Sequence, residues 1–151
     1  MKATWLYRVT AILLLLFAIG HTIGFLTFVP TTLQGQAALA AMNTAHLETK
    51  GSTFTYGMFY RGFGLLLTAY LLFTAYVAWH LGNQSRRHPS EIATLSWVFA
   101  AFQLFTLISS WTYFPAPPIV FSAAVFLCAS GAAAAVQSAA VQNANRNVAP
   151  A

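Results

Sequence analysis

The feature that most constrains the fold is a long apolar segment at residues 6–29, in which Arg8 and His21 are the only ionisable side chains apart from Tyr7. In a helix that rises 1.5 Å per residue, about 20 apolar residues cross the hydrocarbon core of a bilayer. Only helices or closed barrels satisfy the backbone in lipid, and the strands of a barrel span about 10 residues each. Three further segments of similar length and composition cover residues 57–81, 91–113 and 118–141. The sequence therefore predicts an all-α, single-domain integral membrane bundle of four transmembrane helices over residues 1–151.

The first segment also has features of a signal peptide, because Lys2 and Arg8 are followed by an apolar run and by the small residues Ala18-Ile19-Gly20. The apolar run nevertheless continues past Gly20 to Val29. We therefore expect a retained helix.

The composition indicates a protein that is exposed to lipid. Hydrophobic residues make up 58% of the chain and charged residues 6%, whereas a soluble domain carries about 25% charged residues. The 13 Phe, six Tyr and four Trp suit aromatic belts at the membrane interfaces. The seven basic residues are scattered and predict no patch, so the net charge of +5 does not indicate a nucleic-acid partner. A single cysteine, Cys128, rules out an intramolecular disulfide.

Lysine and arginine residues predict the orientation in the membrane. With four spans, Lys2, Arg8, Arg86, Arg87 and Arg146 fall on one side, and Lys50 and Arg61 fall on the other. The positive-inside rule then puts both termini and the loop at residues 82–90 in the cytoplasm. We expect a multi-pass protein of a bacterial inner (plasma) membrane. At the end of that loop, Ser90 is the expected N-cap of the third span.

The loop at residues 30–56 is long and has its own helical pattern. Apolar residues and one histidine recur on one face, at Leu39, Met42, His46 and Leu47. This pattern predicts a short interfacial helix over Leu33–Leu47, ended by Gly51-Ser52, at the outer mouth of the bundle. A flexible loop is the alternative.

Two polar residues inside the spans are candidate site residues. His21 lies beside a GxxxG motif formed by Gly20 and Gly24, which predicts close approach of another helix. Arg61 shares a helix face with Gly64 and is flanked by Tyr60. The alternatives are structural: His21 hydrogen-bonds a neighbouring carbonyl or hydroxyl, and Arg61 extends to the phosphate headgroups.

The third span carries a polar stripe with helical spacing, at Ser96, Ala100, Gln103, Thr106, Ser110 and Tyr113. An unsatisfied amide near mid-membrane is costly, so Gln103 should face the interior. Hydrogen bonding between helices explains such a stripe without any site. The functional hypothesis is a polar cluster in the outer half of the membrane that binds a lipid-soluble molecule, made of His21, Tyr60, Arg61, Gln103, Ser110 and Glu48. We expect His21 and Arg61 to lie within about 8 Å of each other, because both flank glycine-lined faces at similar depth.

The histidines do not predict a cofactor. His21 and His80 should differ in depth by about 15–20 Å, so one haem is not held by both. No HxxxH or HxxE spacing organises His21, His46 and Glu48 for zinc. We expect neither a cofactor nor a metal.

Arg8, the AIGHTIGF run at residues 18–25 and FYRGFG at residues 59–64 carry a resemblance to known proteins. The chain resembles small bacterial four-helix inner-membrane proteins, and its opening is similar to that of DoxX-like proteins. This resemblance implies a four-helix membrane fold and no established reaction. The chain differs from four-helix sterol isomerases of the emopamil-binding type, whose sites are richer in carboxylates within the membrane.

These patterns favour a small integral membrane protein that binds a lipid or hydrophobic ligand. The same features suit an accessory subunit of a membrane complex, or a homo-oligomer. The alternative is a small membrane enzyme acting on a lipid-like or quinone-like substrate, with His21 as acid/base and Arg61 as anion clamp. A transporter or channel is a third hypothesis, but four helices would need an oligomer to form a pore.

Overall fold

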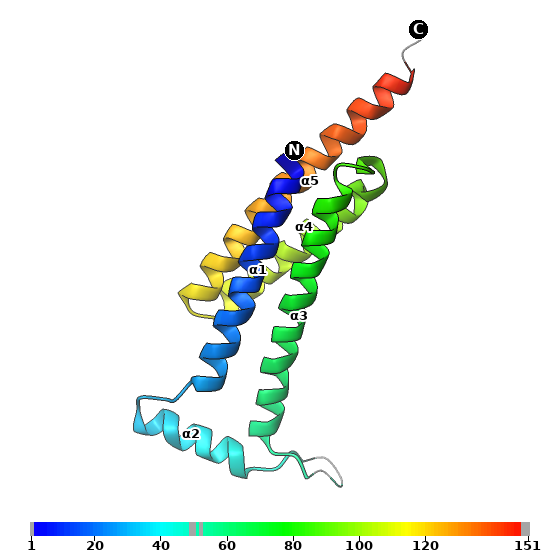
Figure 1. Ribbon diagram of the computed structural model, residues 1–151. Coiled ribbons are helices and arrows are strands. Elements are labelled where there is room, and N and C mark those ends of the chain that lie inside the picture. The colour runs from blue at the N-terminus through cyan, green and yellow to red at the C-terminus, as the bar shows by residue number, and fades with distance from the viewer. Residues whose placement is uncertain (1, 49–50, 52, 149–151) are drawn as a thin grey trace. The chain divides into compact units, whose positions relative to one another are not determined.

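A computed structural model describes residues 2–48, 51 and 53–148, and within them the chain forms five helices and no strand (Figure 1). These helices are α1 (Lys2–Thr27), α2 (Leu33–Thr44), α3 (Tyr56–Gln84), α4 (Pro89–Tyr113) and α5 (Ala116–Val148). Four of them, α1, α3, α4 and α5, are long and apolar enough to cross a membrane. The predictions of an all-α fold and of four long apolar helices are confirmed.

Two predicted helix ends are wrong. Helix α4 begins at Pro89, with His88 in the N-cap position, so Ser90 lies inside the helix instead of capping it. Proline suits a first helical position because its missing N–H would have no partner there. Helix α2 ends at Thr44 instead of Leu47, because Ala45 takes an extended conformation.

The segment that follows α2 is held by backbone hydrogen bonds. Leu47 N donates to Phe54 O (2.9 Å), and Tyr56 N donates to Ala45 O (3.1 Å). Gly51 has a φ of 78°, which glycine adopts without strain. These bonds lead the chain back to the start of α3. Ser52, which was expected to end the helix together with Gly51, lies outside the described residues.

The chain divides into two compact units. One, called here the four-helix unit, contains α1 up to Phe17, α3 from Leu72 onwards, α4 and α5. The other, called here the α2 unit, covers Ala18–Leu71 and contains the end of α1, α2 and the start of α3.

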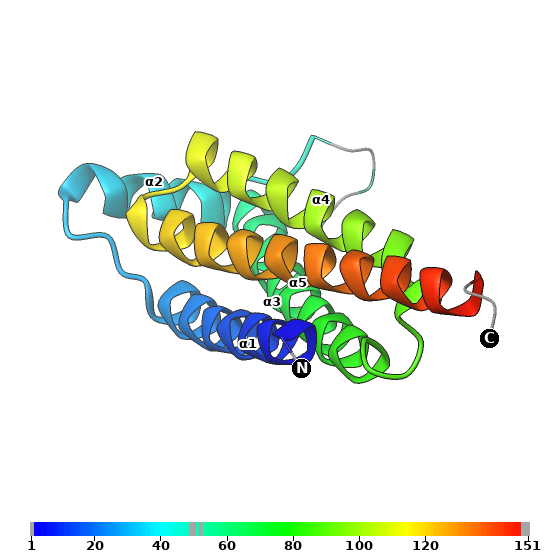
Figure 2. The same cartoon turned by 90° about the horizontal axis from the view of Figure 1, so that it is seen from above.

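Small residues, together with Tyr7, Leu81, Val125 and Val136, contribute to the core of the four-helix unit. Ala129, Ala132 and Ala133 on α5 are fully buried, and α4 and α5 lie side by side (Figure 2). Tyr7 of α1 is also fully buried, and its ring contacts the ring of Phe99 on α4 with centroids 6.4 Å apart. Alanine lets helix backbones approach closely, and such small residues are common where membrane helices pack.

Large apolar side chains cover the outside of these helices. Phe73, Phe105 and Leu127 are 62%, 67% and 68% exposed. A protein in water would hide many of these side chains, because burying one contributes about 1.5–3 kcal/mol. Small residues inside and large apolar residues outside suit helices surrounded by lipid.

Candidate functional site

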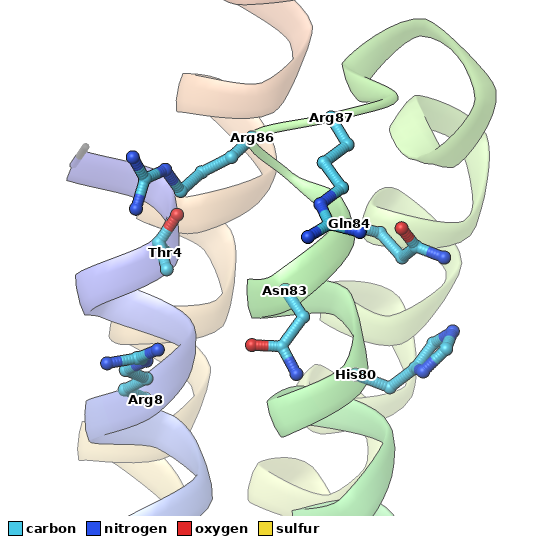
Figure 3. A pocket seen from close by; sticks show the side chains of 7 residues that line it. All are labelled: Thr4, Arg8, His80, Asn83, Gln84, Arg86 and Arg87. Atoms are coloured by element: carbon cyan, nitrogen blue, oxygen red, sulfur yellow. The ribbon is translucent and has the colours of Figure 1, made fainter.

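A basic pocket of about 730 Å³ lies at one end of the four-helix unit, where α1 begins and α3 ends (Figure 3). Three arginines and a histidine contribute to its lining, which contains no Asp or Glu. The seven lining residues are Thr4, Arg8, His80, Asn83, Gln84, Arg86 and Arg87.

The side chains come from three short stretches of the chain. Thr4 and Arg8 are one turn apart on α1, and His80 is in the last turns of α3. Arg86 and Arg87 belong to the loop before α4, and Figure 3 shows Arg86 extending towards the start of α1 and Arg87 extending towards Gln84. Arginine side chains from α1 and from the loop before α4 therefore line one hollow.

Contacts between α1 and α3 hold the walls of the pocket together. Thr4 Oγ1 and Ser85 Oγ are hydrogen-bonded at 2.9 Å, and Ser85 Oγ also donates to Gly82 O at 2.8 Å. A Cβ atom at Gly82 would lie 3.1 Å from Tyr7 Cβ, which is closer than ordinary contact. Glycine at position 82 thus allows the close approach that the pocket requires.

Two local interactions position the arginines. The Arg8 guanidinium lies 5.1 Å from the centroid of the Trp79 ring, a cation–π geometry that keeps it beside α3. After α3, Arg87 N donates to Gln84 O (3.0 Å) and His88 N donates to the same oxygen (2.9 Å). This tight turn keeps Arg86 and Arg87 next to the end of α3.

The carboxylates of the chain leave the charge of the pocket uncompensated. The chain has two acidic residues, Glu48 and Glu91. Glu91 Oε1 is paired with His88 Nδ1 at 3.2 Å, and both side chains are largely exposed. Glu48 belongs to the α2 unit. Three guanidinium groups without a carboxylate in the lining are suited to binding an anion.

The sequence analysis missed this pocket because it treated the basic residues as scattered. The expectation that they form no patch is wrong, since three of the seven line one hollow. One signal was available: Arg8, Arg86 and Arg87 fall on the same predicted side of the membrane. Sequence alone did not reveal that the start of α1 and the end of α3 are neighbours.

The predicted site residue His21 lies in the α2 unit and forms a hydrogen bond with the backbone of α3. Its Nε2 is 3.0 Å from Gly64 O, and because a carbonyl only accepts, Nε2 carries the hydrogen. The ring stacks on Phe25, with centroids 5.7 Å apart. This geometry matches the structural alternative, in which a neighbouring carbonyl satisfies the histidine.

Close packing between α1 and α3 in this unit depends on Gly64 and not on the GxxxG motif. Gly20 and Gly24 have open space where a side chain would be, so the prediction that they form a packing face is wrong within the described chain. By contrast, a Cβ atom at Gly64 would overlap the ring of Phe25. One turn away from these contacts, Thr22 Oγ1 and Thr68 Oγ1 are hydrogen-bonded at 2.9 Å.

The other predicted site residues of the α2 unit lie at its surface. Tyr60 is 47% exposed and its ring centroid is 5.2 Å from that of Phe25, which in turn stacks on His21. Arg61 and Glu48 are both exposed. Phe25 therefore links Tyr60 to His21, and the expected proximity of Arg61 to His21 stays a prediction.

Gln103 and Ser110, the two remaining predicted site residues, belong to the four-helix unit. Both are buried, at 2% and 5% exposure, so the prediction that Gln103 faces the interior is confirmed. Ser110 Oγ and Ser122 Oγ are hydrogen-bonded at 2.9 Å, which joins α4 to α5. Tyr113, at the end of the same stripe, is 79% exposed.

Three buried polar atoms of this unit have no hydrogen-bond partner among the described residues. They are Gln103 Nε2, Ser96 Oγ and Tyr7 Oη. Burying a polar group without a hydrogen-bond partner costs free energy.

In residues 2–48, 51 and 53–148, no three His, Cys, Asp or Glu side chains gather in a way that could hold a metal ion. No protein-family model, curated protein or solved structure matches this chain. The resemblance to DoxX-like proteins therefore stays a prediction, and the function has to be argued from the site.

Proposed function

We propose that the chain is a multi-pass integral membrane protein that binds an anionic phospholipid, with the phosphate headgroup in the basic pocket. One observation carries the proposal: Arg8, Arg86 and Arg87 line a single hollow without any carboxylate. A guanidinium binds phosphate oxygens through two parallel hydrogen bonds, which gives both strength and geometry. Basic pockets between membrane helices are known to hold anionic headgroups.

The position of the pocket along the helices supports a headgroup as the ligand. From Arg8 to the end of α1 at Thr27 the helix rises about 28 Å, close to the ~30 Å thickness of a hydrocarbon core. If α1 crosses the bilayer, Arg8 is at the boundary of the core and Thr4 is beyond it. The hydrogen bond between Thr4 and Ser85 keeps the arginine loop at the same level.

Two tryptophans near Arg8 agree with this depth. Trp79, which contacts the Arg8 guanidinium, is 45% exposed, and Trp5, one turn earlier on α1, is 64% exposed. Tryptophan side chains concentrate at the level of the headgroups. The arginines and these tryptophans together form a surface suited to the membrane–water interface.

The proposal also includes an orientation. The pocket lies on the side that the positive-inside rule puts in the cytoplasm of a bacterial inner membrane. Helix α2 is then the interfacial helix of the segment that joins the first two spans. It has no buried residue, and it runs across the adjoining ends of α1 and α3 within the α2 unit (Figure 1).

The test is native mass spectrometry of the purified protein after exchange into mixed micelles with phosphatidylglycerol or phosphatidylcholine. We expect stoichiometric adducts with phosphatidylglycerol that persist at activation energies that remove phosphatidylcholine. A variant with Arg8→Gln, Arg86→Gln and Arg87→Gln should lose this preference. The matched control, Arg61→Gln together with Arg146→Gln, removes exposed arginines outside the pocket and should retain it.

Two results would overturn the proposal: equal retention of both lipids by the unmodified protein, or equal lipid preference in the pocket and control variants. Inorganic phosphate at millimolar concentration tests the source of the phosphate. Displacement of phosphatidylglycerol by phosphate would mean that the pocket serves a soluble anion. Co-purification of a stoichiometric protein without any lipid would instead support an accessory subunit of a membrane complex.

A further inference from the structure

A second, smaller hollow shares two arginines with the basic pocket. It has a volume of about 190 Å³ and is lined by Thr4, Trp5, Arg8 and Arg86. Thr4, Arg8 and Arg86 line both hollows, whereas Arg87 lines only the basic pocket and Trp5 only the smaller hollow. The two hollows therefore share the side chains of Thr4, Arg8 and Arg86.

From this arrangement we infer that the ligand carries two phosphate groups, one in each hollow. The inference rests on the proposed function and specifies its ligand class as a lipid with a diphosphoryl headgroup. Arg8 and Arg86 contact both phosphates, and Arg87 binds only the phosphate in the larger hollow. Each phosphate then has at least one guanidinium fork available to it.

The charge of the site agrees with a doubly charged ligand. One phosphodiester carries a single negative charge and would leave two of the three arginines unneutralised. Two phosphates neutralise two of the three charges, and the linings of both hollows contain no carboxylate that would compete. Lys2 adds a further cation in a neighbouring hollow that also includes Thr4.

The lining residues other than the arginines also divide between the two phosphates. Asn83 and His80 offer hydrogen-bond donors in the larger hollow. Trp5 provides an indole N–H and a large apolar surface in the smaller one, where the glycerol and upper acyl region of a lipid would lie. Each phosphate thus has hydrogen-bond donors in its own hollow, and the apolar surface of Trp5 distinguishes a lipid from a soluble diphosphate.

The experiment is a competition in native mass spectrometry between diphosphatidylglycerol and phosphatidylglycerol, present at equal phosphate concentration. We expect the unmodified protein to prefer the diphosphoryl lipid by about tenfold or more, since a second charge-assisted contact contributes at least that factor. Arg87→Gln should remove most of this preference while phosphatidylglycerol is still retained through Arg8 and Arg86. Arg8→Gln should weaken binding of both lipids, and Arg146→Gln, outside both hollows, should change neither.

The results distinguish a failure of the two-phosphate inference from a failure of the proposed function. Equal binding of the two anionic lipids, each above phosphatidylcholine, would overturn the two-phosphate inference and leave the proposed function intact. An equal loss of both lipids in the Arg87→Gln variant would also overturn only the two-phosphate inference, because it would indicate a single anion-binding position. If neither anionic lipid is preferred over phosphatidylcholine, the proposed function fails as well.

Pyrophosphate distinguishes a lipid from a soluble diphosphate. We expect that millimolar pyrophosphate does not displace diphosphatidylglycerol, because it lacks the acyl chains that bind beside Trp5. Displacement would assign the two hollows to a soluble diphosphate and overturn the lipid assignment.

Discussion

Gly64 is the residue of α3 against which the Phe25 side chain of α1 packs in the α2 unit. Its carbonyl accepts a hydrogen bond from His21, and the ring of Phe25 occupies the space where a side chain would be. The His21 and Tyr60 rings both contact the same phenylalanine. A single glycine thus makes room for the Phe25 ring, which contacts a ring of its own helix and a ring of α3.

Gly64→Ala should therefore destabilise the protein. The new methyl group forces the Phe25 ring away from α3, and the contacts of that ring with His21 and Tyr60 are disturbed; overpacking of this kind costs about 1–3 kcal/mol. The measurement is the thermal unfolding midpoint in detergent. Gly62→Ala is the matched control, because open space surrounds position 62 on the same helix. Equal midpoints for the two variants would contradict this account of Gly64.

His21→Leu tests whether the histidine is structural. Loss of the donor to Gly64 O should lower stability by about 1 kcal/mol, the size of a typical hydrogen bond between membrane helices. His21→Gln keeps a hydrogen-bond donor. Its thermal unfolding midpoint should therefore lie between the midpoints of His21→Leu and the unmodified protein. If both variants unfold at the native midpoint, the hydrogen bond contributes nothing and a role for His21 in chemistry gains weight.

At the scale of helices, the end of α3 and the start of α1 form the frame of the basic pocket. Gly82 packs against Tyr7, and the Thr4–Ser85 pair closes the same contact one turn later. Tyr7 itself is fully buried and extends this contact to Phe99 of α4. The geometry of the arginines thus depends on how closely two helices approach.

Gly82→Val should separate these helices and disrupt the pocket. Position 82 has no room for a branched side chain, so we expect a loss of about 2 kcal/mol in stability, together with weaker retention of phosphatidylglycerol. Thermal unfolding and native mass spectrometry measure the two effects. Gly131→Ala is the control, since a Cβ atom there would make only an ordinary 3.4 Å contact with Leu6. Undiminished lipid retention in Gly82→Val would show that the pocket does not depend on this contact.

For the whole molecule, the distribution of charge is the basis of the orientation that we propose. Of the two basic residues predicted on the outer side, Arg61 is exposed and Lys50 lies outside the described residues. The basic pocket adds a second reason for the same orientation, because anionic lipids enrich the cytoplasmic surface and attract clustered arginines.

Single cysteines introduced in a Cys128→Ser background test this orientation. Asn145→Cys, near the end of α5, should react with a membrane-impermeant maleimide only after the cells are lysed. Thr53→Cys, in the segment between α2 and α3, should react in cells with an intact inner membrane and a permeabilised outer membrane. The reverse pattern would place the basic pocket on the outer surface and contradict the orientation in the proposal.

The sequence by itself determined the helical class and the position of the four long helices. Apolar runs of this length are recognisable locally, since the cost of placing backbone and charge in lipid depends on each segment alone. The burial of Gln103 followed from the same cost. By contrast, the ends at Thr44 and Pro89 were set by local hydrogen bonds and by proline geometry that hydropathy does not register.

Only the tertiary structure decided which residues meet. The rest of α1 and the whole of α2 and α3 separate Arg8 from Arg86 and Arg87 in the sequence, and nothing in their spacing shows that they line one hollow. In the same way, a GxxxG motif at Gly20 and Gly24 predicted a packing face, whereas Gly64 provides the close contact. The physical reason is that packing depends on the shapes of two helix surfaces at once, and a single segment records only one of them.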